Sequence, residues 1–154
     1  KGKRMENIWK QWKRFLLSEN RVKYSGILMI KPTEMVLSEL EALQAMLPES
    51  AKRLERKDLH LTLIHQSVLK PFRKKLKNMD LPAPPMIILD DEVLERKSPG
   101  KKSWAVKVIN QEEMREYVQT IMEMLGSDNT DPEPERRFHV TLANLTGDPR
   151  DSVR

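Results

Sequence analysis

The chain of 154 residues contains no cysteine, only three histidines and few aromatic residues, which make up 5% of it. Disulfide bonds and thiolate metal sites are therefore excluded. No apolar run approaches the roughly 20 residues that a membrane-spanning helix needs. No apolar segment typical of a signal peptide is visible near the N-terminus. We therefore expect a cytoplasmic protein without a membrane partner.

Charged residues make up 33% of the chain and hydrophobic residues 38%, with a net charge of +5 at pH 7. This composition is typical of a globular protein, and a chain of this length can bury its own hydrophobic core. We expect residues 1–154 to form a single domain. The excess of basic residues weakly favours partners that carry phosphate groups.

Residues 5–19 show an amphipathic helical pattern, with Trp9, Trp12 and Phe15 among its apolar positions. The apolar face of this N-terminal helix either packs on the core or docks on a membrane or a partner.

The remaining patterns predict an order of elements in which strand, helix and strand occur twice. The repeat predicts one α+β domain of two similar lobes that face each other. The residues 98–102 (SPGKK) are typical of a hairpin turn between strands. Apolar and alternating runs predict strands over residues 25–31, 59–65, 86–89, 104–109 and 138–145, and helical spacing predicts helices over 36–47, 70–78 and 114–125.

Two of the predicted strands carry the same short pattern, LHLTL at residues 59–63 and FHVTL at residues 138–142. Alternate side chains of a strand point to opposite faces, so His60 and Thr62 share one face. His139 and Thr141 share a face in the second copy. Such polar pairs on a buried strand are costly unless they bond to each other or line a wet cleft. Both interpretations remain open at this point.

The paired His-x-Thr pattern suits phosphodiester chemistry. Histidine titrates near pH 6.5, so one ring can accept a proton while the other donates one at the same pH. Threonine hydroxyls can donate hydrogen bonds to phosphate oxygens as negative charge builds. Histidines and carboxylates show no ligand spacing of a metal site, so we expect no metal and no other cofactor. The third histidine, His65, is expected on the opposite face in a structural role.

These two motifs, residues 60–63 (HLTL) and 139–142 (HVTL), resemble those of the two-histidine (2H, LigT-like) phosphoesterase superfamily. The resemblance implies two pseudo-symmetric lobes of antiparallel sheet with outer helices and a central cleft that holds both motifs. It implies that His60 and His139 are the general acid and base and that Thr62 and Thr141 hold phosphate. The chain would then be a phosphodiesterase or nuclease that needs no metal.

Within this superfamily, residues 59–72 are similar to the phage anti-CBASS nucleases, which degrade cyclic di- and trinucleotide messengers of bacterial defence. That likeness implies a phage protein acting in host–virus interaction in the bacterial cytosol, with no obligatory protein partner. Aromatic side chains stack bases in that group, and Tyr24 and Trp104 are the candidates here, with core packing as their alternative. Lys107 is a candidate phosphate contact beside them, or part of a solvated surface.

Two other functions fit the same residues. The first is action on 2′,3′-cyclic phosphate or 2′,5′-linked RNA ends, as a phosphodiesterase or ligase. The second is a nucleotide-binding module without catalysis. The polar residues 127–137, which lead into the second motif, form either a lid over the cleft or a plain surface loop.

Overall fold

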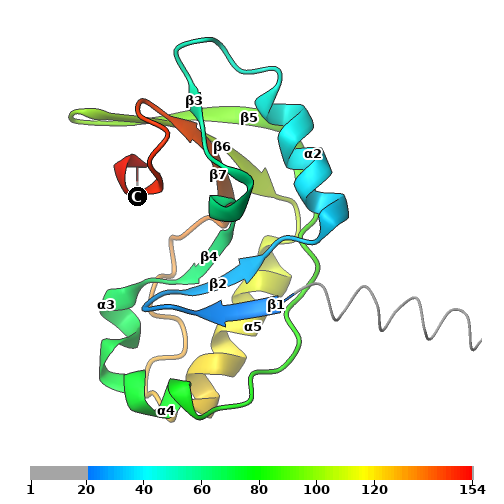
Figure 1. Ribbon diagram of the computed structural model, residues 1–154. Helices are drawn as coiled ribbons and strands as arrows, with labels where there is room; N and C mark the ends of the chain where they lie inside the picture. Colours follow the sequence, from blue (N-terminus) through cyan, green and yellow to red (C-terminus); the bar gives the residue numbers. More distant parts are fainter. Residues whose placement is uncertain (1–20, 154) are drawn as a thin grey trace, which may run out of the picture.

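The structure is a computed structural model that describes residues 21–153 (Figure 1). The expected amphipathic helix over residues 5–19 lies outside these residues. Within them, no helix is both long enough and apolar enough to cross a bilayer.

One antiparallel sheet of seven strands forms the centre of the described chain. Its strand order is β1-β2-β4-β7-β6-β5, and the short β3 pairs with β7 outside this path. The sheet and its helices make this an α+β protein, as expected. The strands are β1 (Arg21–Tyr24), β2 (Leu28–Lys31), β3 (Lys52–Arg53), β4 (Leu61–Ile64), β5 (Leu89–Ser98), β6 (Lys101–Val108) and β7 (His139–Asn144).

Two longer helices pack on one face of the sheet. Thr33 caps α2, since its side chain accepts a hydrogen bond from the Val36 amide at 3.3 Å. Gly126, with a φ of 75°, follows the end of α5 as its sequence position predicts. The helices are α2 (Glu34–Gln44), α3 (Gln66–Leu69), α4 (Arg73–Lys77) and α5 (Gln111–Met124), with 3-10 turns η1 (Arg56–Asp58), η2 (Lys70–Phe72) and η3 (Pro149–Asp151).

The sheet has two halves, β1-β2-β4 and β7-β6-β5, which meet where Leu61 of β4 pairs with Val140 of β7. Each helix leaves one half and contacts the other. Helix α2 follows β2 in the chain but contacts β7, and α5 follows β6 but contacts β4. Figure 1 shows α2 beside β5 to β7 and α5 behind β1, β2 and β4. The helices therefore tie the two halves together.

The side chains on the helix-covered face of the sheet form the hydrophobic core. One row of side chains crosses the junction between the halves on four adjacent strands, namely Ile30, Leu61, Val140 and Val106, all 0% exposed. Burying one such side chain stabilises a protein by about 1.5–3 kcal/mol. Because neighbouring residues on each strand point the other way, this row also fixes which side chains lie on the opposite face.

Some expected elements differ from the structure. The strand expected over 86–89 is wrong, because β5 begins only at Leu89. The Asn110 side chain donates to the Met86 carbonyl at 2.7 Å and accepts from the Ile88 amide at 3.4 Å, while the Ile88 carbonyl accepts from the Ile109 amide at 2.7 Å. The helix expected over 70–78 is divided between η2 and α4. Strand β1 has no counterpart among the expected elements.

Candidate active site on the open face of the sheet

The sheet face opposite the helices, called the open face below, carries both His-x-Thr motifs. Because Leu61 pairs with Val140 in antiparallel register, Thr62 lies opposite His139 and His60 lies opposite Thr141. Directly opposite residues have Cβ atoms about 4.5–5.5 Å apart, and diagonal neighbours are about 7–8 Å apart. The two histidines are such diagonal neighbours. The structure therefore brings together all four residues that the sequence pattern singled out.

His60 is held by the backbone just before it. Its Nδ1 lies 2.7 Å from the carbonyl oxygen of Asp58, two residues earlier, in η1. A carbonyl can only accept, so Nδ1 carries the proton and donates. The turn itself is anchored to α2, since Arg56 makes ion pairs with Glu34 at 2.7 Å and Glu41 at 3.1 Å. The bond to Asp58 leaves Nε2 as the nitrogen of His60 available for proton exchange.

His139 repeats this arrangement in the other half of the sheet. Its Nδ1 lies 3.0 Å from the carbonyl oxygen of Arg137, again two residues earlier. The start of its strand is fixed by Gln111 of α5. The Gln111 side chain donates to the carbonyls of Val108 and Phe138 at 2.8 Å each and accepts from the Phe138 amide at 2.7 Å. The Nε2 of His139 is therefore also the nitrogen that faces away from its anchor.

Burial disfavours the protonated form of both rings. Burial lowers the pKa of His60 below its ordinary value, and the Lys31 ammonium acts in the same direction. Burial lowers the pKa of His139 further, to about 4, with the guanidinium groups of Arg96 and Arg136 adding to the effect. The backbone hydrogen bond of each ring opposes these shifts. Two neutral imidazoles can accept protons, and a bound anion would favour protonation of either one.

The threonine hydroxyls are available to a ligand. Within residues 21–153, neither the Thr62 nor the Thr141 side chain makes a hydrogen bond, and both side chains are partly exposed. A hydroxyl next to an imidazole on the same sheet face can donate to a phosphate oxygen. The expectation that the threonines only satisfy the histidines is therefore not what the structure shows.

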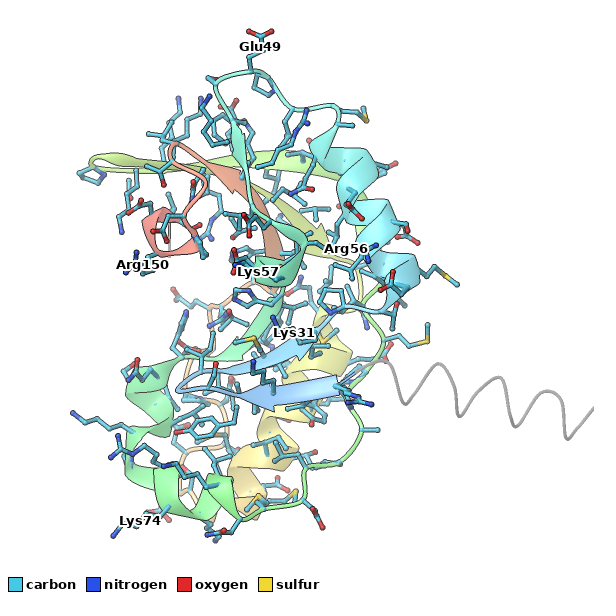
Figure 2. All side chains as sticks on the ribbon, viewed as in Figure 1. Lys31, Glu49, Arg56, Lys57, Lys74 and Arg150 are labelled. Atoms are coloured by element: carbon cyan, nitrogen blue, oxygen red, sulfur yellow. The ribbon has the colours of Figure 1, made fainter. Side chains whose placement is uncertain are left out.

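A lysine stands beside each histidine on the neighbouring strand. Lys107 of β6 pairs with His139, which places the predicted phosphate contact on the open face with an exposed side chain. In the other half, the pair of Ile30 with Leu61 puts Lys31 of β2 opposite His60. Figure 2 shows Lys31 close to Lys57, whose carbonyl accepts a hydrogen bond from the Lys31 ammonium at 2.9 Å. Sequence reasoning missed Lys31, although its place at the end of a predicted strand was a usable signal.

Arg96 of β5 is a further functional residue that the sequence did not indicate. It pairs with Ser103 and so shares the open face with the residues of β6 that neighbour His139. Its Nη1 lies 2.8 Å from Nε2 of His139 and 3.5 Å from the carbonyl of Val153. No local pattern predicts this contact, because it depends on the register of three strands.

The end of the described chain folds back over β6. Asn144, 0% exposed, donates to the Asp148 carbonyl at 2.6 Å and to the Ser152 hydroxyl at 3.1 Å. The Val153 amide then donates to the buried Ser103 hydroxyl at 2.7 Å. This turn positions the Val153 carbonyl next to Arg96.

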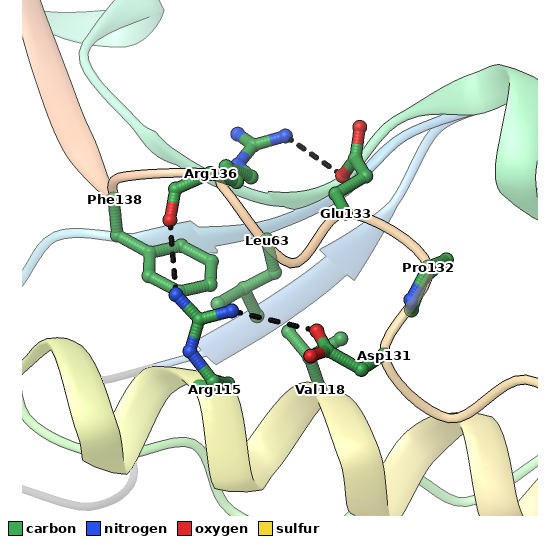
Figure 3. Close-up of a pocket in the computed structure, with 8 residues that line it drawn as sticks. All are labelled: Leu63, Arg115, Val118, Asp131, Pro132, Glu133, Arg136 and Phe138. Carbon is green, nitrogen blue, oxygen red and sulfur yellow. Dashed lines mark hydrogen bonds and ion pairs between the residues drawn. The ribbon is translucent and has the colours of Figure 1, made fainter.

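The residues 127–137, expected as a lid or a surface loop, are fastened to the rest of the protein. Arg115 of α5 donates to the Pro134 carbonyl at 2.9 Å and pairs with Asp131 at 3.4 Å. Arg136 donates to the Thr62 carbonyl at 2.6 Å. Figure 3 shows the small pocket that Arg115, Asp131 and Arg136 line together with Leu63 and Val118. These hydrogen bonds and the ion pair with Asp131 favour a fixed surface loop over a moving lid.

His65 is expected on the face opposite to His60. The structure places it after the end of β4, at the start of α3, where strand parity no longer applies. Its ring contacts the Glu133 carboxylate and the Arg136 guanidinium. These contacts support the structural role expected for His65. The strand alternation from which this role is expected does not extend to this residue.

The two aromatic candidates lie away from the open face. Trp104 is only 2% exposed and packs against Ala51 and Ala143, so its ring has no free face on which a base could stack. Tyr24 pairs with Leu28 and packs partly buried against the helix-covered core. These positions favour core packing, the alternative given for both residues, over base stacking, because the alternation of side chains on β1 and β6 turns both rings inward.

Within residues 21–153, no group of three or more histidine, aspartate or glutamate side chains is arranged to hold a metal ion. In comparisons with known proteins, no family model, curated protein or solved structure matches this chain.

Proposed function

We propose that this chain is a metal-independent phosphodiesterase of the two-histidine type, with His60 and His139 as its acid–base pair. The observation that carries the proposal is the duplicated geometry on the open face. Each ring is held through Nδ1 by the carbonyl two residues before it, and each has a threonine of the other motif opposite. Two similar halves of sheet joined at these motifs support the two-lobe arrangement expected for such enzymes.

The arrangement can perform an in-line displacement at phosphorus. The Nε2 of one histidine takes the proton of a hydroxyl nucleophile as the new P–O bond forms. The other histidine, protonated when the phosphate anion is bound, gives its proton to the leaving oxygen as the old P–O bond breaks. Thr62 and Thr141 donate hydrogen bonds to the non-bridging oxygens.

The substrate that we propose is a cyclic di- or trinucleotide, in which a ribose 2′-hydroxyl is the internal nucleophile. Cations gather around the motifs from both halves, with Lys31 beside His60 and Lys107 beside His139. Two lysines in equivalent positions favour a ligand with more than one phosphate. RNA ends with a 2′,3′-cyclic phosphate or a 2′,5′ linkage are the competing substrates.

Single substitutions of the two histidines test this proposal. We expect His60→Ala and His139→Ala each to lower the turnover of a cyclic dinucleotide by roughly 10²-fold or more, with a bell-shaped pH profile in the unchanged protein. Assays in chelator compare the cyclic dinucleotide, its 2′-deoxy analogue and an RNA with a cyclic phosphate end. Lys74→Ala is the control, since this exposed side chain of α4 lies away from the motifs (Figure 2), and it should retain most activity.

Three outcomes would contradict parts of the proposal. Ligand binding without any turnover would show a binding module instead of an enzyme. Consumption of the RNA end alone would assign the competing substrate. Undiminished turnover in either motif variant would remove the histidine pair from the mechanism.

A further inference from the structure

The two halves of the open face are alike in their histidines, threonines and lysines, but the two histidine rings differ in their contacts. The His139 ring receives a hydrogen bond from the Arg96 guanidinium, whose Nη1 lies 2.8 Å from Nε2. Within residues 21–153, no such contact to Nε2 of His60 is present. The nitrogen that Arg96 contacts is the same one that proton transfer would need.

An arginine can only donate, so this contact requires an unshared electron pair on Nε2. With Nδ1 donating to the Arg137 carbonyl, the ring has one proton, and it is on Nδ1. The contact therefore keeps His139 neutral and at the same time covers its basic nitrogen. His139 is in the protonation state of a general base, but its electron pair is already in use.

A phosphodiester offers Arg96 a better partner than an imidazole. The guanidinium group matches two oxygens of a phosphate in a bidentate geometry, and the negative charge of the phosphate attracts its positive charge, whereas the neutral imidazole offers a single electron pair. Arg96 is half-buried on the open face, where Thr141 and the lysine next to His139 also lie. A phosphate bound between the two motifs lies within reach of this side chain.

We propose that Arg96 binds the phosphate of the substrate and that this binding uncovers Nε2 of His139, which makes His139 the general base and His60 the general acid. This inference rests on the proposed function and extends it, because it assigns different roles to two histidines in equivalent positions. In the free protein Arg96 blocks the base. In the complex it neutralises the anion, and the base is released only where a phosphate is present.

The charged and titratable groups around His139 come from several elements. Burial is the largest cause of its lowered pKa, and Arg96, Arg136 and His65 each add to it. These groups are Arg96 on β5, Lys107 on β6, Arg136 and Arg137 before β7, His65 after β4 and Glu133 in the adjoining loop.

Histidine NMR titration of the ligand-free protein tests the contact without any assumption about turnover. We expect Arg96→Gln to raise the pKa of His139 by about one unit, since a cation next to the ring is removed, and to leave His60 nearly unchanged. Arg96→Lys keeps the charge and should change the His139 pKa less. Arg73→Gln is the matched control, because it removes one positive charge on α4 and should shift neither ring.

Dimethyl phosphate, the simplest phosphodiester anion, tests the second half of the inference. In the unchanged protein it should raise the pKa of His139, and Arg96→Gln and Arg96→Lys should weaken its binding, by about tenfold for the glutamine variant. With an active substrate, Arg96→Gln should raise KM and move the acidic limb of the pH profile upward.

An unchanged His139 titration in Arg96→Gln, or equal binding of dimethyl phosphate to both proteins, would overturn the inference. A variant that fails to fold is recognised by the loss of dispersed spectra, and Arg96→Lys then provides the same comparison. If the titrations and the anion binding behave as expected while no nucleotide is consumed, the phosphodiesterase proposal fails and the Arg96 contact stands.

Discussion

Folding holds the His139 ring in its neutral form, so acid should destabilise the protein through this residue. The folded-state pKa of about 4 lies below the ordinary value of 6.5. At pH values between them, the unfolded chain binds a proton that the folded protein does not. The stability that results is fully present above pH 6.5 and is lost as the pH falls toward 4.

The size of this effect follows from the shift. One pKa unit corresponds to about 1.4 kcal/mol, so the shift from 6.5 to about 4 sets an upper limit of about 3.5 kcal/mol. Between pH 7.5 and pH 4.5, and with solvent screening at the half-buried ring, we expect about 2 kcal/mol. The variant His139→Gln has no titrating group at this position. Between pH 7.5 and pH 4.5, its free energy of unfolding should therefore fall by about 2 kcal/mol less than that of the unchanged protein.

Urea unfolding followed by tryptophan fluorescence at the two pH values measures this difference. Titrating carboxylates contribute to both proteins and cancel in the comparison. His60→Gln should differ in the same direction, because burial also lowers the pKa of His60. Equal acid losses in the unchanged protein and in His139→Gln, within about 0.5 kcal/mol, would refute the reasoning, as would an NMR titration of His139 near its ordinary pKa.

Two further predictions concern buried residues of β6 and β7. Asn144→Ala removes a fully buried amide that holds the final turn through several hydrogen bonds. It should lower the free energy of unfolding by about 2–4 kcal/mol. A loss below about 1 kcal/mol in urea unfolding would show that this network is dispensable. Trp104→Ala leaves a cavity at a buried position and should lower the free energy of unfolding by about 3–5 kcal/mol. Trp104→Phe, which keeps most of the packing, should leave KM for a nucleotide unchanged, and a clear rise in KM would restore the stacking role.

Several features of the fold could be predicted because their causes are local. The turn between β5 and β6 follows from Pro99 and Gly100, which suit the two central positions of a tight turn, and Gly100 has a φ of 76°. Helix α5 follows from apolar residues at helical spacing, and these are buried in the structure. Strand β1 was missed because it is a short edge strand with exposed charged residues.

The aromatic candidates show where local reasoning ends. Trp104 and Tyr24 are candidates for base stacking because they are aromatic, but the sheet face on which each ring lies depends on strand register. In the pairing of β6 with the motif strand β7, the register shifts between Trp104 and Ala105. Arg96 has no distinguishing sequence signal at all, and only the pairing of β5 with β6 directs it toward His139.

Strand alternation alone determined that His60 shares a face with Thr62 and that His139 shares one with Thr141, because a two-residue period is a property of every strand. The tertiary structure decided that β4 and β7 are neighbours, that both motifs lie on the same face, and that Arg96 covers the ring of His139. Such pairing joins residues far apart in the chain, and it is set by the burial of one continuous core row, which no single segment encodes.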